Sequence, residues 1–155
     1  MSYVIQGIDP APFRRLYGLS DATLAAEQVV RFTVEKKPDA PCRVELVDVE
    51  SGETVLLVNY THLPVASPYR SSHAIFVREG AEVAARFENE VPEPLAIRLL
   101  SVRAFDDAGM MTDAEVIEGR DLEPLIARML ADPAVAYLHA HNARRGCFAA
   151  RVDRL

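Results

Sequence analysis

The stretch from residue 137 to residue 153 constrains the fold most, because it holds two alternating segments on either side of a short turn. Polar-capable and apolar side chains alternate over residues 137–141 and again over residues 147–153, which is the period of a β-strand. The segment between them, Asn142 to Gly146, carries turn residues, so the stretch predicts an antiparallel hairpin.

The apolar side chains of this hairpin have to share one face of the sheet, and that requirement predicts the register. Two imidazoles, His139 and His141, and the thiol of Cys147 then lie together on the opposite face. We therefore expect His141 and Cys147 to be cross-strand neighbours. The predicted pairs are Leu138 with Ala150 and Ala140 with Phe148 on the apolar face, and Tyr137 with Arg151, His139 with Ala149 and His141 with Cys147 on the other.

The rest of the chain predicts short strands, tight connections and a few helices. Helices are expected from Asp9-Pro10 to Gly18, from Ser20 to about Gln28 and over residues 122–131, with a helical turn at 91–95. Further strands are expected over residues 2–8, 29–35, 42–49, 53–62, 73–78, 83–87, 97–105 and 110–117.

Two of these strand pairs are expected to be hairpins, 42–49 with 53–62 and 97–105 with 110–117. Residues 55–58 are apolar on both faces, as in a strand that is covered on both sides. The pattern predicts one α+β domain over residues 1–155, with a mostly antiparallel twisted sheet and two or three helices packed on it.

Composition excludes several classes of protein. Half of the residues are hydrophobic, which argues against disorder, and the formal net charge is −6. No basic patch interleaved with aromatic residues is present, so we expect no nucleic acid partner. No apolar run approaches the roughly 20 residues that span a bilayer, and the N-terminus lacks a signal-peptide pattern, so we expect no membrane partner.

The two cysteines, Cys42 and Cys147, are too few and too far apart for a disulfide framework. We expect both to be reduced, in a cytoplasmic protein. A single bridge between them is the less favoured alternative.

The cluster of His139, His141 and Cys147 allows three interpretations. The His-x-His spacing on a strand with a thiol opposite suggests an open zinc site, but Arg144 and Arg145 in the turn would oppose a cation. We therefore expect no metal and no cofactor. The same residues could be catalytic, with Cys147 as a nucleophile and a histidine as its base. In the plainest interpretation, the histidines form local hydrogen bonds and Cys147 is a small core residue.

A second candidate site is the loop at residues 67–73. A cation, hydroxyl groups, a phenol and an imidazole lie close together there and could bind a small anionic molecule. The alternative is a solvated loop whose serines cap the next strand. The candidate ligand-binding residues are Tyr69, Arg70, Ser71, Ser72 and His73, together with Asn142 from the hairpin turn.

Several motifs resemble the bacterial family catalogued as domain of unknown function 1203. They are Cys42-Arg43, Gly52 to Leu57, Asn59-Tyr60, His62-Leu63-Pro64, Ser67 to Val77, Arg103 to Asp106, Gly109-Met110-Met111, Tyr137 to Ala143 and Gly146-Cys147. The resemblance spans almost the whole chain. It implies a bacterial and cytoplasmic protein, and it carries no reaction, ligand or catalytic residue.

The residues favour a small-ligand-binding or catalytic domain with one polar cleft between the 67–73 loop and the 139–147 hairpin. Arg70, Ser71 and Ser72 would hold an anionic group there, and His139, His141 and Cys147 would supply the chemistry. The opposing hypothesis is a non-enzymatic interaction or structural domain, such as a homodimer.

Overall fold

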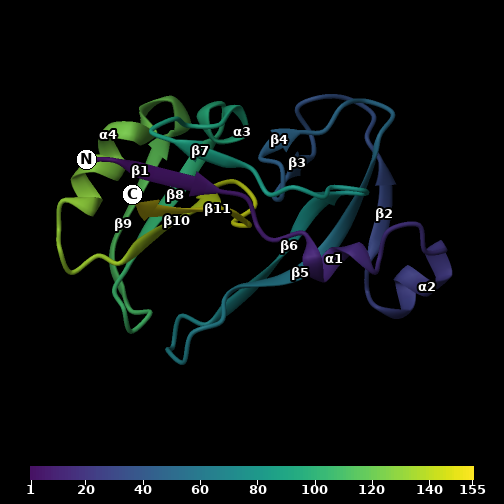
Figure 1. Ribbon diagram of the computed structural model, residues 1–155, viewed down its shortest axis with the longest axis horizontal. Coiled ribbons are helices and arrows are strands. Elements are labelled where there is room, and N and C mark those ends of the chain that lie inside the picture. Colours follow the sequence, from purple (N-terminus) through teal and green to yellow (C-terminus); the bar gives the residue numbers. More distant parts are fainter.

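Two sheets form the scaffold, and the computed structural model describes all residues from 1 to 155 (Figure 1). All strand pairs are antiparallel except β3 with β6. The first sheet has the order β7 (Arg86–Glu88), β1 (Tyr3–Gln6), β11 (Phe148–Arg154), β10 (Tyr137–Asn142), β8 (Leu99–Phe105) and β9 (Met111–Glu118). The second has the order β2 (Val30–Thr33), β5 (Thr54–Leu63), β6 (Ser71–Arg78), β3 (Pro41–Cys42) and β4 (Val47–Asp48).

Each sheet has its own hydrophobic core. In the first, helix α4 (Leu122–Leu130) buries its apolar side against the sheet, as its sequence period predicts. In the second, Phe13 of α1 (Ala11–Arg14) and Leu24 of α2 (Asp21–Ala26) join the core. A short helix, α3 (Glu93–Ala96), and a 3₁₀ turn (Gly119–Asp121) complete the chain. The predicted α+β class and antiparallel pairing are confirmed, with two sheets where one was expected.

The predicted hairpin between residues 42–49 and 53–62 is wrong. Residues 43–46 form a turn between β3 and β4, and β5 pairs with β2 and β6 instead. Both edges of β5 are occupied by β2 and β6, so residues 42–49 have no edge of β5 to pair with, and the turn at 43–46 instead supplies backbone acceptors to residues 8 and 85. The carbonyl of Arg43 accepts from Ile8 N, and that of Val44 accepts from Ala85 N. The other predicted hairpin, now β8 with β9, is confirmed.

The 137–153 hairpin forms, but its predicted register is wrong: β11 is shifted by one position opposite His141 and, beyond a β-bulge, by two positions opposite Leu138 and Ala140. Ala140 lies opposite Ala150 and His141 lies opposite Phe148, so Ala149 is the extra residue. The bulge moves the Phe148 ring to the face of the histidines, and Ala149 joins the core on the other face. The predicted pair of His141 with Cys147 is therefore not formed.

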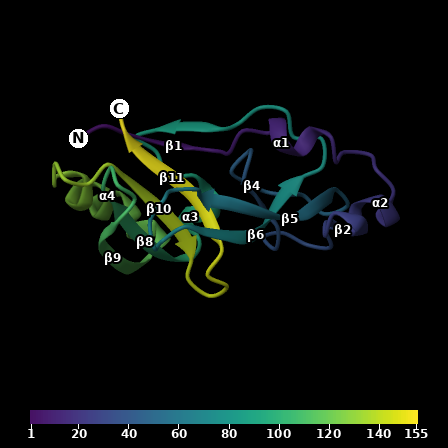
Figure 2. The same ribbon diagram turned by 90° about the horizontal axis from the view of Figure 1, so that it is seen from below.

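The β5–β6 hairpin brings the two sheets together. Figures 1 and 2 both show its far end leaving the second sheet and passing beside β10 and β11 of the first. Aromatic contacts agree with this view, since His62 of β5 stacks on Phe148 of β11 with ring centroids 5.1 Å apart. Residues that are far apart in sequence meet at this junction.

Close backbone packing where β1 leads into the second sheet predicts that Gly7 cannot be replaced. A Cβ atom at Gly7 would lie 1.8 Å from the carbonyl oxygen of Val44. We expect Gly7→Ala to lower the free energy of unfolding by at least about 3 kcal/mol, because backbone on both sides blocks relaxation. The control is Gly52→Ala, where the added Cβ meets nothing within 4 Å and only the positive φ costs about 1 kcal/mol. Equal losses in urea unfolding of the two variants would contradict this prediction.

Candidate functional site

All four histidines of the chain converge where the β5–β6 hairpin meets β10. His62 lies near the end of β5, His73 lies on β6, and His139 and His141 lie on β10. The ring centroid of His62 lies 4.8 Å from that of His73, 4.9 Å from that of His141 and 5.6 Å from that of His139. The sequence places these residues in separate segments, and only the packing of the two sheets unites them.

Three of these imidazoles are buried and stay neutral. The exposed fraction is 7% for His62, 1% for His139 and 0% for His141. Burial lowers the pKa of His139 and of His141 to about 3 and that of His62 to about 4. The neighbouring histidines and the charge of Arg103 lower these pKa values further. At neutral pH each ring therefore offers a lone pair on one nitrogen.

A carbonyl acceptor assigns the lone pair of His141, and the contacts of His62 are compatible with one arrangement that matches it. Nδ1 of His141 lies 3.0 Å from the carbonyl oxygen of Gly146, which can only accept, so Nδ1 carries the proton and Nε2 the lone pair. Nε2 of His62 lies 3.0 Å from Ser71 Oγ and 2.9 Å from His73 Nδ1. With Nε2 as the donor, the lone pair of His62 falls on Nδ1.

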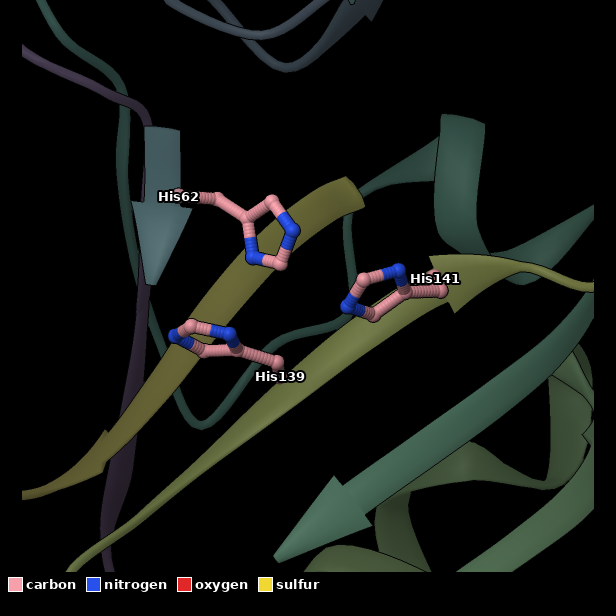
Figure 3. A group of neighbouring side chains, drawn as sticks. All are labelled: His62, His139 and His141. Carbon is pink, nitrogen blue, oxygen red and sulfur yellow. The ribbon is translucent and has the colours of Figure 1, made fainter. Parts of the chain in front are cut away.

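Each buried ring has a nitrogen without any hydrogen-bond partner. These atoms are His62 Nδ1, His139 Nδ1 and His141 Nε2. Figure 3 shows the three rings turned toward one shared space between the strands. One ring nitrogen of each residue lies within 4.8 Å of one from each of the others. Buried polar atoms normally have partners, so three orphaned nitrogens in one place suggest a missing ligand.

The spacing fits a small cation. The three nitrogens lie within 4.8 Å of one another, so at the widest spacing a central point lies about 2.8 Å from each, and zinc binds imidazole nitrogen at about 2.0–2.1 Å. Neutral imidazole suits zinc, copper, iron and nickel.

Aromatic side chains keep the site dry and fix the rings. Phe148 stacks on His62 at an interplanar angle of 7° and meets His139 and His141 edge-on. Phe105 meets His139 edge-on with centroids 5.4 Å apart. This packing leaves the imidazoles little rotational freedom, which preorganises them for one ligand.

The predicted anion-binding loop only partly reaches the site. Ser71 and His73 contact His62, as described above. Ser72, between them on β6, points away and is exposed. Arg70 is exposed and bonds the carbonyl of Pro64 in its own loop, and Tyr69 packs edge-on against Phe105. Ser71 and His73 therefore contact the histidine cluster, and Arg70 does not.

Cys147 and Asn142 lie on the sheet face opposite the imidazoles. Sγ of Cys147 accepts hydrogen bonds from Arg43 Nη2 at 3.1 Å and from Asn142 Nδ2 at 3.6 Å. Arg43 is 3% exposed and also bonds the carbonyls of Phe148 and Pro41. The bulge explains the separation, since it turned Phe148 toward the histidines and left its neighbour Cys147 on the other side. Both cysteines are free thiols.

The sequence left open whether His62 converges with the other histidines and did not put it among the candidate site residues, and it contained no indication of Arg103. Arg103 pairs with His139 across β8 and β10, on the same face. The hairpin β5–β6 contained a usable signal, because His62, Ser71 and His73 fall near one end of it. No pattern in the sequence indicated that this end of the β5–β6 hairpin would pack against the first sheet.

The depressed pKa values predict a loss of stability in mild acid for protein that has been freed of metal by a chelator. Unfolded histidines bind a proton near pH 6.5, whereas His62, His139 and His141 do so only at about 4, 3 and 3 in the folded protein. Below pH 6.5 the unfolded state therefore holds more protons, and the free energy of unfolding should fall by up to about 1.4 kcal/mol per pH unit for each histidine. Urea unfolding between pH 5 and 6.5 measures this slope. His139→Gln should reduce it by one histidine's share, and an unchanged slope would contradict the prediction.

The contacts of the two thiols predict different reactivity toward iodoacetamide. Cys42 is 0% exposed and its pKa is raised by burial, whereas Cys147 is partly exposed. We expect Cys147 to be alkylated at least about tenfold faster than Cys42 near neutral pH. Because Sγ contacts Arg43 and Asn142 and no imidazole, His141→Ala should leave the rate of Cys147 unchanged. A large drop in that variant would restore the predicted pairing of thiol and histidine.

None of the helices has both the length and the apolar composition that crossing a membrane requires. No curated protein and no solved structure matches the chain significantly. One family model, described as "Protein of unknown function (DUF1203)", matches residues 39–154. This range includes all four histidines and most of the chain, and it agrees with the motifs that the sequence shares with that family. The chain belongs to the DUF1203 family.

Proposed function

We propose that the chain binds a divalent transition-metal ion, such as zinc, through His62, His139 and His141 and acts on a small ligand there. The observation that carries this proposal is the set of three buried, neutral imidazoles whose unpartnered nitrogens face one space. It makes the chain a small-ligand-binding or catalytic protein with a metal as its reactive centre.

The energetic cost of the bare cluster supports the proposal. Each buried polar atom without a partner costs about 1–3 kcal/mol, and this site has three. Burial also makes protonation of the rings unfavourable, so the site cannot satisfy itself by taking up protons at neutral pH. A ligand that accepts three lone pairs removes both costs at once. An ordered water is the competing occupant, and metal analysis distinguishes the two.

The groups around the histidines suit a metal centre. Metal-bound histidines usually donate their second N–H to a protein acceptor, which orients the ring. The Gly146 carbonyl does this for His141, and Ser71 and His73 are placed to do it for His62. The Gly146 carbonyl selects the tautomer of His141 whose lone pair faces inward, and the contacts of His62 allow the same arrangement.

Three protein ligands leave a coordination position open, as in catalytic rather than structural zinc sites. In such sites the metal polarises a bound ligand and lowers the pKa of a bound water. The aromatic wall of Phe148 and Phe105 limits water, and the histidines hold the ligand geometry. We propose that the reactive position lies on this face and that Cys147, on the other face, takes no part.

The sequence argued against a metal because of two arginines in the hairpin turn. Both Arg144 and Arg145 are exposed, and neither is hydrogen-bonded to the histidines. The third ligand is also different, since His62 takes the place that the sequence gave to Cys147. With these two changes the site suits a metal better than the sequence suggested.

The metal proposal predicts that purified protein loaded with zinc retains about one equivalent after dialysis, measured by elemental analysis. His139→Ala and His141→Ala should lose it, and acidification should release it as the ligands protonate. The matched control is Cys147→Ser, which should retain a full equivalent. Metal-free wild-type protein whose thermal stability is indifferent to zinc and to chelator would overturn the proposal.

The interaction hypothesis rests on a different observation. The edge strand β2 exposes Val30 and Phe32, at 48% and 45%, and one of its sides has no partner strand. Unpaired edges with apolar side chains favour pairing with another chain, so β2 would be the contact of a homodimer. Sedimentation of wild type and Phe32→Lys tests it, with a monomeric wild type as the contrary outcome.

We also propose a cytoplasmic location in a bacterium. The two free thiols support a reducing compartment. This location does not affect the chemistry proposed above.

A further inference from the structure

One arginine beside the histidines has no acidic partner. Arg103 of β8 lies opposite His139 of β10. In the sheet β10 lies between β8 and β11. Its only side-chain hydrogen bond is from Nε to Ser101 Oγ, at 3.4 Å, and no carboxylate lies within ion-pair distance of it. Ser101 lies opposite His141 in the same pairing. The Arg103 side chain therefore runs along β8 beside both histidines.

The arginine on the other side of His139 has an acidic partner, and its charge helps to lower the pKa of His139 but of none of the other histidines. Arg151 of β11 also lies opposite His139, and it forms two-pronged hydrogen bonds to Asp153 at 2.7–3.0 Å. Its guanidinium rests 4.0 Å from the ring centroid of Tyr137. Of the two arginines beside His139, Arg151 therefore has a counterion and Arg103 has none.

The uncompensated charge acts on the whole cluster. Arg103 is half-buried, and burial lowers its pKa because the charged form is desolvated. Its charge contributes to the lowered pKa of all four histidines. A dication held by three neutral imidazoles would add two further positive charges next to it. Such a cluster requires an anion, because like charges repel strongly where water is excluded.

We infer that the metal centre binds a small oxyanion, held by the open metal position on one side and by the Arg103 guanidinium on the other. The inference rests on the proposed function. Guanidinium has a planar fork of donors that matches carboxylate and phosphate oxygens, and such charge-assisted pairs are stronger than neutral hydrogen bonds. Arg70, which the sequence put forward for this role, is exposed and bonded to its own loop. The substrate class is therefore a small carboxylate or phosphate.

The test uses full-length protein loaded with Co²⁺, whose visible spectrum reports the coordination of the metal. Acetate and inorganic phosphate are titrated separately at constant ionic strength into wild type, Arg103→Gln and Arg151→Gln. We expect at least one of the two anions to change the wild-type spectrum with saturation. Arg103→Gln should weaken that binding at least about tenfold, since it removes charge-assisted hydrogen bonds. Arg151→Gln, the matched control, should bind the anion within about threefold of wild type.

Cobalt affinity separates this inference from the proposed function. Arg103→Gln should bind Co²⁺ as tightly as wild type or more tightly, because a repelling cation has gone. A wild type that binds no Co²⁺ would overturn both ideas. A wild type that binds Co²⁺ but whose spectrum ignores both anions, or whose anion affinity is equal in Arg103→Gln, would overturn the oxyanion inference alone.

Two further arms complete the design. Saturation by acetate and not by phosphate assigns the site to carboxylates, and the reverse assigns it to phosphates. Arg103→Lys retains the charge without the fork, so an intermediate anion affinity supports recognition by geometry and charge together. Thermal unfolding of each variant shows whether it is folded. If Arg103→Gln is unfolded, Arg103→Lys decides, and wild-type anion affinity in that variant contradicts the inference.

Discussion

The contact of Phe148 with the β5–β6 hairpin is the interaction on which the rest of the arrangement depends. Its ring stacks on His62, and its backbone carbonyl accepts a hydrogen bond from the buried Arg43. Phe148, in the first sheet, therefore contacts both β5 and the turn between β3 and β4, which belong to the second sheet. The β-bulge at Ala149 makes this possible, because it turns the ring toward the histidines while β11 continues along β10. Without that extra residue the Phe148 ring would point into the core of the first sheet, and His62 would lose its stacking partner.

The arrangement resolves a conflict between stability and chemistry. Imidazoles in a dry aromatic setting stay neutral, and the outward nitrogens of His141 and His62 have partners in Gly146, Ser71 and His73. Their inward nitrogens are left without partners, which costs free energy that the two hydrophobic cores must supply. Groups held at an energetic cost are often functional, because a ligand that removes the cost binds more tightly. Arg103 is a second example, because it is a half-buried charge that has no acidic partner in the protein.

The sequence predicted the local structure well and the meeting of the sheets poorly. The stripe of α4 and the β8–β9 hairpin follow from side-chain periods and turn residues close together in the chain, and both are present. The bulge beside Phe148 leaves no trace in alternation, so the register of β10 and β11 was wrong and Cys147 was placed with the histidines. His62 is 77 positions before His139, and no local pattern links them. Two of the three proposed ligands, His139 and His141, were found because the two residues share one strand.

The origin of the three histidines has a consequence for how the molecule opens. His62 comes from one sheet and His139 and His141 from the other, and the two cores are separate clusters. A ligand bound to all three would act as a clasp, because the sheets could not part without breaking a bond to it. Its binding free energy would then add to the contacts that already join the sheets, such as the Arg98–Asp48 ion pair and the hydrogen bond from Arg43 to the carbonyl of Phe148. Occupancy would therefore stabilise the junction of the two sheets.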